Sequence, residues 1–114
     1  MKEKVLKSLY DIKIAINEIE SFLPQDNMNF YDYQSNQILK RAIERNLEII
    51  GEAISRIFKE EPSFPIEEGK RIIGLRNQII HGYDSISDEN IWSIIITHLP
   101  VLKTKVEGLI QVNE

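Results

Sequence analysis

The chain has 114 residues, of which 42% are hydrophobic and 28% are charged, a balance typical of a globular domain with one core. It contains no cysteine, which excludes disulfides, thiolate nucleophiles and cysteine-based zinc sites. The formal net charge of −4 argues against a protein that coats nucleic acid with a broad basic surface, but it permits a local positive cleft or a more basic partner.

The first residues are charged and lack the continuous apolar stretch of a signal peptide. No apolar run approaches the roughly 20 residues that span a membrane. We therefore expect a cytoplasmic protein with no membrane association, in which residues 1–114 form a single domain.

The spacing of apolar residues predicts helices along the whole chain. Residues 2–22 carry apolar side chains at steps of three and four, as in an amphipathic helix. Pro24 ends this helix, and the aromatic residues within 30–33 are expected to form a short turn beneath the bundle. A second long helix is predicted over residues 34–59, and a proline-containing loop follows it.

A third helix is expected to begin near Pro65 and to end near His81, where Gly82 suits the left-handed conformation that closes many helices. Residues 85–88 supply N-caps for the next helix, and Pro100 is predicted to kink or restart it. No segment shows the alternation of a β-strand. The fold class is therefore all-α, a bundle of four or five helices.

Arg76 is embedded in the apolar face of the third helix. At about 100° per residue, its neighbours three and four positions away are Ile72, Ile73, Ile79 and Ile80. A guanidinium in such a stripe is costly unless it is paired or faces a cleft. Two interpretations stay open: a structural arginine bonded to a glutamate or to helix-end carbonyls, and an arginine that binds phosphate with its two-pronged geometry.

His81 follows five positions later, about 140° around the helix from Arg76. The two side chains converge if the helix unwinds at its end, or if a second copy of the chain brings its own motif alongside. Histidine exchanges protons near neutral pH, so this pair has the chemistry that metal-independent RNA cleavage requires. Asn77 could bond a phosphate oxygen or orient His81. Judged alone, His81 is more often a helix cap and Tyr83 a packed aromatic.

Other polar residues give weaker signals. Asn46 lies on the apolar face of the second long helix and should bond a neighbouring backbone carbonyl, with a brace of Arg76 as the alternative. Glu44, Glu48 and Glu52 repeat like a metal-binding row, but no Glu-x-x-His accompanies them, so we expect a solvated acidic face. Phosphate-binding glycine loops and zinc-ligand patterns are absent from the sequence. We expect neither a metal nor a cofactor.

The segment Ile72–Tyr83 resembles the signature of the HepT-like toxins, which belong to the HEPN (higher eukaryotes and prokaryotes nucleotide-binding) superfamily. The resemblance lies mainly in Arg-Asn-x-x-x-His-Gly-Tyr, which shows no departure at the key positions. Residues 47–53 are similar to the family's central helix, and residues 91–100 to its C-terminal part. The likeness thus covers nearly the whole chain, although the first 30 residues match only in pattern.

This resemblance implies an all-helical homodimer of HEPN type whose two motifs face one cleft. It implies a metal-independent ribonuclease, the toxin of a type VII-like toxin–antitoxin pair, with RNA as its substrate and an MntA-type nucleotidyltransferase as its antitoxin. In this family the antitoxin silences the toxin by AMPylation of the motif tyrosine. Carried over, Arg76 and His81 are catalytic, Asn77 supports them, and Tyr83 is modified. Cleavage through the 2′-hydroxyl is expected to leave a 2′,3′-cyclic phosphate.

Two other hypotheses compete with the ribonuclease. The same fold could serve as a non-catalytic dimer that binds a nucleotide or a partner protein, with Arg76 recognising phosphate. It could also be a purely structural helical dimer in which Arg76 forms a buried ion pair. The surroundings of Arg76 in the folded protein distinguish these hypotheses.

Overall fold

The regular elements of the chain are all helical in the part that the structure describes. This computed structural model describes residues 2–23, 29–81 and 87–113. Its elements are α1 (Glu3–Phe22), α2 (Phe30–Gln34), α3 (Gln37–Glu60), α4 (Gly69–Ile80), and a continuous C-terminal rod made of α5 (Asp88–Ser93), the π-helical turn η1 (Ile94–His98) and α6 (Leu99–Asn113). The predicted all-α bundle is therefore confirmed.

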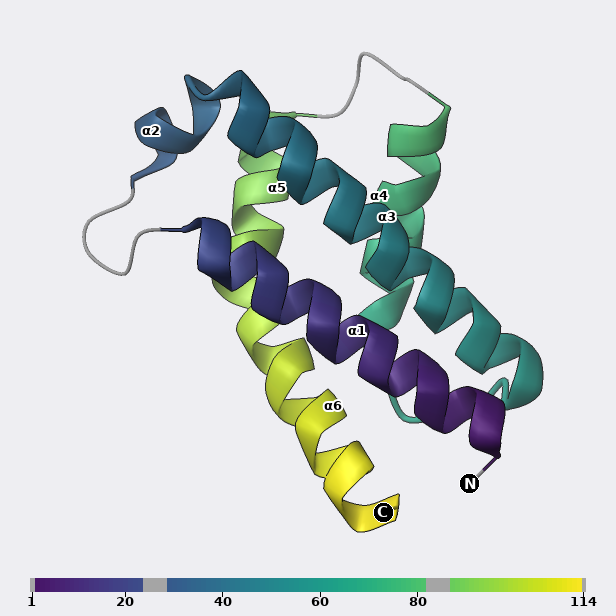
Figure 1. Cartoon of the computed structure of the whole chain (residues 1–114). Coiled ribbons are helices and arrows are strands. Elements are labelled where there is room, and N and C mark those ends of the chain that lie inside the picture. The colour runs from purple at the N-terminus through teal and green to yellow at the C-terminus, as the bar shows by residue number, and fades with distance from the viewer. Residues whose placement is uncertain (1, 24–28, 82–86, 114) are drawn as a thin grey trace.

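Helices α1 and α3 run antiparallel and side by side, and they form the most extensive contact of the bundle (Figure 1). Lys2 at the start of α1 accordingly bonds Glu60 at the end of α3, at 3.3 Å. Helix α4 packs on α3, and α6 packs on α1. No helix within the described ranges combines the length and apolar character that a membrane crossing needs.

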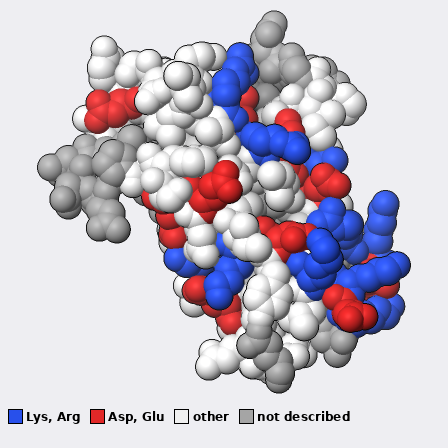
Figure 2. Space-filling model, viewed as in Figure 1, with Lys and Arg blue, Asp and Glu red and all other residues white. Residues whose placement is uncertain are grey.

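The outer surface of α1 and α3 carries interspersed charges of both signs (Figure 2). The glutamates that repeat along α3 each face an arginine of the same helix, in the pairs Arg41–Glu44, Arg45–Glu48 and Arg56–Glu52. Such i,i+3 and i,i+4 pairs give a helix modest support. The expected acidic face is thus an ion-paired one, and no group of metal-binding side chains occurs among the described residues.

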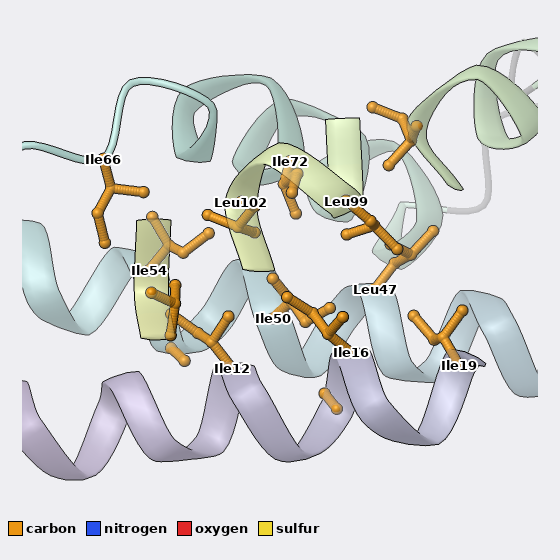
Figure 3. Packing of buried hydrophobic residues seen from close by; sticks show 14 of the residues in the cluster. Ile12, Ile16, Ile19, Leu47, Ile50, Ile54, Ile66, Ile72, Leu99 and Leu102 are labelled. Carbon is orange, nitrogen blue, oxygen red and sulfur yellow. The ribbon is translucent and has the colours of Figure 1, made fainter. Parts of the chain in front are cut away.

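The core is built from the apolar stripes that the sequence pattern predicted. Ile12 and Ile16 of α1 meet Ile50 and Ile54 of α3, and Leu102 of α6 closes the layer (Figure 3). All of these side chains are fully enclosed. Burying one such side chain contributes about 1.5–3 kcal/mol, so the contact of α1 with α3 supplies much of the fold's stability.

Helix α2 carries the predicted aromatic turn. Asn29 caps it through a reciprocal pair of bonds with Asp32. Tyr33 is fully buried, with its ring centroid 5.5 Å from that of Trp92. The aromatic contact ties α2 to α5, and the Lys40–Asp88 ion pair of 3.1 Å ties α3 to the same helix.

Some element boundaries differ from the predictions for local reasons. The second long helix begins at Gln37 because Asn36 caps it, accepting a bond from the Leu39 amide at 3.0 Å. Helix α4 begins at Gly69, four residues after Pro65, because turns occupy the intervening residues. Ser87 caps α5 as expected, whereas Gly82 and Ser85 lie outside the described residues.

Pro100 lies inside the C-terminal rod without ending it. The amide of Leu99 bonds the carbonyl of Ile94, five residues back, which widens the turn just before the proline. A proline ring clashes with the preceding helical turn and lacks an amide hydrogen, and a π-type turn relieves such strain. The helix therefore continues through Pro100, and α6 starts at Leu99.

The buried hydroxyl of Tyr33 has no hydrogen-bond partner among the described residues. Burial raises the pKa of this phenol, and the nearby carboxylates of Asp88 and Glu44 raise it further by a smaller amount. Because an unsatisfied buried hydroxyl costs about 1–3 kcal/mol, we expect Tyr33→Phe to leave the free energy of unfolding unchanged or to raise it. Tyr33→Leu is the control that removes the ring contacts and should lower it. A loss of stability in Tyr33→Phe, measured by urea denaturation, would contradict the structure.

Candidate active site on helix α4

Helix α4 buries a narrower face than its sequence predicts. Ile72 and Leu75 are enclosed, Ile73 and Ile79 are half-buried, and Ile80 is 49% exposed. The expectation that Ile80 belongs to a buried arc is therefore wrong. The physical reason is that α4 makes its extensive contact with α3 alone. Arg76 consequently lies at the border of the buried face.

The aliphatic part of Arg76 lies against the backbone of α3. A Cβ atom added to Gly51 would meet the Arg76 Cβ at 2.7 Å and its Cδ at 2.8 Å. The arginine is half-buried as a residue, and its Nε atom is sealed from solvent. Two helices can approach this closely only where one of them lacks a side chain.

The charge of Arg76 is not neutralised within the described part of the chain. Its buried Nε has no hydrogen-bond partner there, and no carboxylate there pairs with the guanidinium. By contrast, Arg41, Arg45 and Arg56 on α3 are all paired. The hypothesis of a structural ion pair at Arg76 thus finds no partner among these residues. A half-buried guanidinium in this condition is suited to an anion such as phosphate.

His81 and Asn77 lie together on the exposed flank of α4. His81 is the C-cap, and its backbone amide bonds the carbonyl of Asn77 at 3.1 Å. Both residues are exposed. Because α4 stays helical up to Ile80, Arg76 and His81 remain about 140° apart around its axis. The described helix therefore does not bring the two together, and both Tyr83 and Gly82, where the helix was expected to unwind, lie outside the described residues.

Helix α4 is a local concentration of positive charge in a chain of net charge −4. Between Gly69 and Ile80 it carries Lys70, Arg71 and Arg76 and no acidic residue. The preceding Glu68 is engaged with His98, whose Nδ1 lies 2.8 Å from its carboxylate. Positive potential thus gathers on α4, as an interaction with a polyanion requires.

Asn46 does not brace Arg76. Its side-chain amide donates to the carbonyl of Ala42 at 3.1 Å, and to the Glu18 carboxylate at 3.4 Å. The predicted bond to a neighbouring backbone carbonyl is confirmed. Arg76 instead packs against Gly51, a residue to which we assign no role from the sequence. An isolated glycine within a helical pattern is the signal that could have revealed this packing.

The fold and the site define a helical-bundle protein with a cationic motif at the end of α4. A family model described as "Ribonuclease HepT-like" matches residues 12–109. The chain belongs to this HepT-like family, within the HEPN superfamily.

Relatives of known family resemble the chain over most of its length. "Putative RNase MJ1380" of Methanocaldococcus jannaschii is 35% identical over 109 residues, which cover 93% of this chain and 96% of that protein. "Probable ribonuclease HepT" of Thermococcus cleftensis is 34% identical over 113 residues, with 96% and 98% covered. "Putative RNase TTE0752" of Caldanaerobacter subterraneus is 34% identical over 85 residues, with 74% and 76% covered. No solved structure matches the chain significantly.

We expect Arg76→Met to raise the free energy of unfolding by about 1 kcal/mol, because methionine keeps the apolar stem and removes an unsatisfied buried donor. Arg56→Met is the matched control. It removes a guanidinium paired with Asp11 and Glu52 and should leave stability unchanged or slightly lower. Urea denaturation of the two variants measures both values. A strong destabilisation by Arg76→Met would show that the guanidinium has a stabilising partner after all.

Proposed function

We propose that this chain is a metal-independent ribonuclease whose active site includes Arg76 and His81. The observation that carries the proposal is the half-buried guanidinium of Arg76, which has no carboxylate partner among the described residues and precedes an exposed histidine on the same helix. Membership of the HepT-like family and relatives named as RNases support it. Residues 1–114 act as one HEPN-type domain in this proposal.

The chemistry requires one proton taken and one proton given. His81 accepts the proton of a ribose 2′-hydroxyl while water protonates the departing 5′-oxygen, or water accepts the 2′ proton while His81 protonates the 5′-oxygen. The 2′-oxygen attacks phosphorus, the bond from phosphorus to the 5′-oxygen breaks, and a 2′,3′-cyclic phosphate and a 5′-hydroxyl result. Arg76 stabilises the charge that develops on the phosphoryl oxygens, and Asn77 bonds one of them. DNA lacks the 2′-hydroxyl and is not cut.

A homodimer is the assembly that makes this site complete. Arg76 and His81 are about 140° apart on one straight helix, so one chain presents them in different directions. The half-exposed Ile80 and half-buried Ile73 offer an apolar flank beside Arg76. A second copy that covers this flank would bring its own His81 toward Arg76. The site is then composite, with each chain supplying part of it.

The biological role we propose is that of the toxin in a type VII-like toxin–antitoxin pair, acting on RNA in the cytoplasm. Its partner is an MntA-type nucleotidyltransferase that attaches AMP to Tyr83. Tyr83 is two residues from His81 in the sequence, so the added phosphate would carry negative charge and bulk to the site. It would repel RNA and could engage the unpaired Arg76.

One observation also favours a second candidate function. An unpaired guanidinium is sufficient to recognise a phosphate without any reaction. The alternative is therefore a non-catalytic dimer that holds a nucleotide or a phosphate-bearing partner at the same place.

Cleavage of a labelled RNA in EDTA by purified wild-type protein tests the proposal. We expect Arg76→Met and His81→Gln each to lower kcat by about 100-fold or more, since each removes charge stabilisation or proton transfer from the transition state. Arg45→Met, which alters an exposed paired arginine on α3, is the control and should retain full activity. Nucleotide binding without RNA cleavage by the wild-type dimer would favour the second candidate.

Mixing the two inactive variants tests whether the site is composite. In a heterodimer of Arg76→Met with His81→Gln, one of the two sites would receive an intact arginine from one chain and an intact histidine from the other. After exchange of subunits, we expect the mixture to recover up to about a quarter of wild-type activity. Random pairing makes about half of the dimers heterodimers, and one of the two sites in each heterodimer is intact. Complete absence of recovery in verified heterodimers would place both residues of a site on one chain.

A further inference from the structure

We infer that Gly51 on α3 is a positioning residue for Arg76. The absence of a side chain at Gly51 sets where the guanidinium lies. The inference rests on the proposed function for its catalytic consequence, while its structural part stands on the α3–α4 contact itself.

The contact at Gly51 is made by Arg76. The three nearest atoms to a Cβ built on Gly51 are the Arg76 Cβ at 2.7 Å, its Cδ at 2.8 Å and its Cγ at 3.3 Å. Distances under 3.0 Å are not tolerated between such atoms. The Cβ of Arg76 is attached directly to the backbone of α4, so rotation of the side chain cannot move it away. An alanine at position 51 therefore has to displace α4 together with Arg76.

Backbone conformation does not explain a glycine at this position. Gly51 is buried within the long helix α3, where its backbone is helical like that of its neighbours. A glycine inside a helix costs about 1 kcal/mol relative to alanine. The close approach of Arg76 is a physical reason for a glycine at position 51, because the methyl group of an alanine would obstruct that approach.

Two glycines of the partner helix α4 provide internal comparisons. At Gly69, a Cβ would meet the Ile54 Cγ2 at 2.6 Å and the Ile66 Cγ2 at 3.2 Å. That contact is as tight as the one at Gly51 and lies in the same helix pair, but it involves apolar side chains. At Gly74 a Cβ would meet nothing within 4 Å. Gly69 therefore controls for packing of α3 on α4, and Gly74 controls for helix propensity.

The position of the stem decides where the charged end of Arg76 reaches. The stem is pressed on Gly51 and the Nε is enclosed, so the side chain has little freedom to compensate for a shift of α4. A displacement of about 1 Å at a reacting centre can cost about 100-fold in rate. In the proposed mechanism Arg76 stabilises charge that develops in the transition state. Such a shift should therefore lower kcat more than it raises KM.

The first experiment compares RNA cleavage by Gly51→Ala, Gly69→Ala and Gly74→Ala, well below the melting temperature of each. We expect Gly51→Ala to lower kcat by about 100-fold with KM changed by less than about threefold. Gly69→Ala should have a lower melting temperature than wild type. Its kcat should stay within about threefold of wild type, because the Ile54 contact lies about 10 Å along α4 from Arg76. Gly74→Ala should match wild type. Folded Gly51→Ala with wild-type kcat, or equal losses in Gly51→Ala and Gly69→Ala, would overturn the inference.

The second experiment uses melting temperature and does not depend on catalysis. Arg76→Gly removes all three atoms that a Cβ at position 51 would meet. Gly51→Ala should therefore lower the melting temperature of the wild type and raise that of Arg76→Gly, where only the helix propensity of alanine remains. Gly69→Ala should lower it in both backgrounds. The same sign for Gly51→Ala in both backgrounds would refute the contact.

The two experiments separate the two possible failures. If wild-type protein does not cleave RNA, the proposed function fails, and the reversal of sign in melting temperature still decides whether Gly51 seats Arg76. If Gly51→Ala does not fold alone, folding of the Gly51→Ala, Arg76→Gly double variant supports the inference. Failure of the double variant to fold, when Arg76→Gly itself folds, overturns it.

Discussion

The close approach of α4 to α3 at Gly51 is the constraint on which the candidate site depends. It presses the stem of Arg76 onto the α3 backbone and encloses the Nε atom. The extensive packing of α1 on α3 supports this arrangement, because it holds α3 rigidly in the core. The guanidinium is thus presented by two helices that the core holds in place, as a preorganised site requires.

The fold tolerates an energetic cost at this point. A buried donor without a partner destabilises a protein by about 1–3 kcal/mol, whereas the fully enclosed side chains of α1 and α3 contribute about 1.5–3 kcal/mol each. The core can therefore offset the unsatisfied Nε donor of Arg76 at its border. Each unsatisfied buried group in a folded protein calls for a physical explanation, and the Nε of Arg76 is such a group in a member of the HepT-like family.

Charge is arranged differently on the two helices that meet at Gly51. Helix α3 pairs Arg41, Arg45 and Arg56 with glutamates of its own. Helix α4 carries Lys70, Arg71 and Arg76 without an acidic residue. An acidic chain can therefore present a local cationic surface. The glutamates of α3 are paired with arginines of the same helix, so they do not neutralise the positive charges of α4.

The sequence by itself determined the helices, their apolar stripes and the family. Ile12 and Ile16 in α1, and Ile50 and Ile54 in α3, are four residues apart, and this local periodicity is strong enough to specify buried faces. The same periodicity predicted a wider buried face on α4 than the chain has, since Ile80 is exposed. Periodicity does not say how many neighbours a helix has. Only the tertiary structure decided that Gly51 receives Arg76, since that contact joins residues 25 positions apart through a helix crossing that no local pattern encodes.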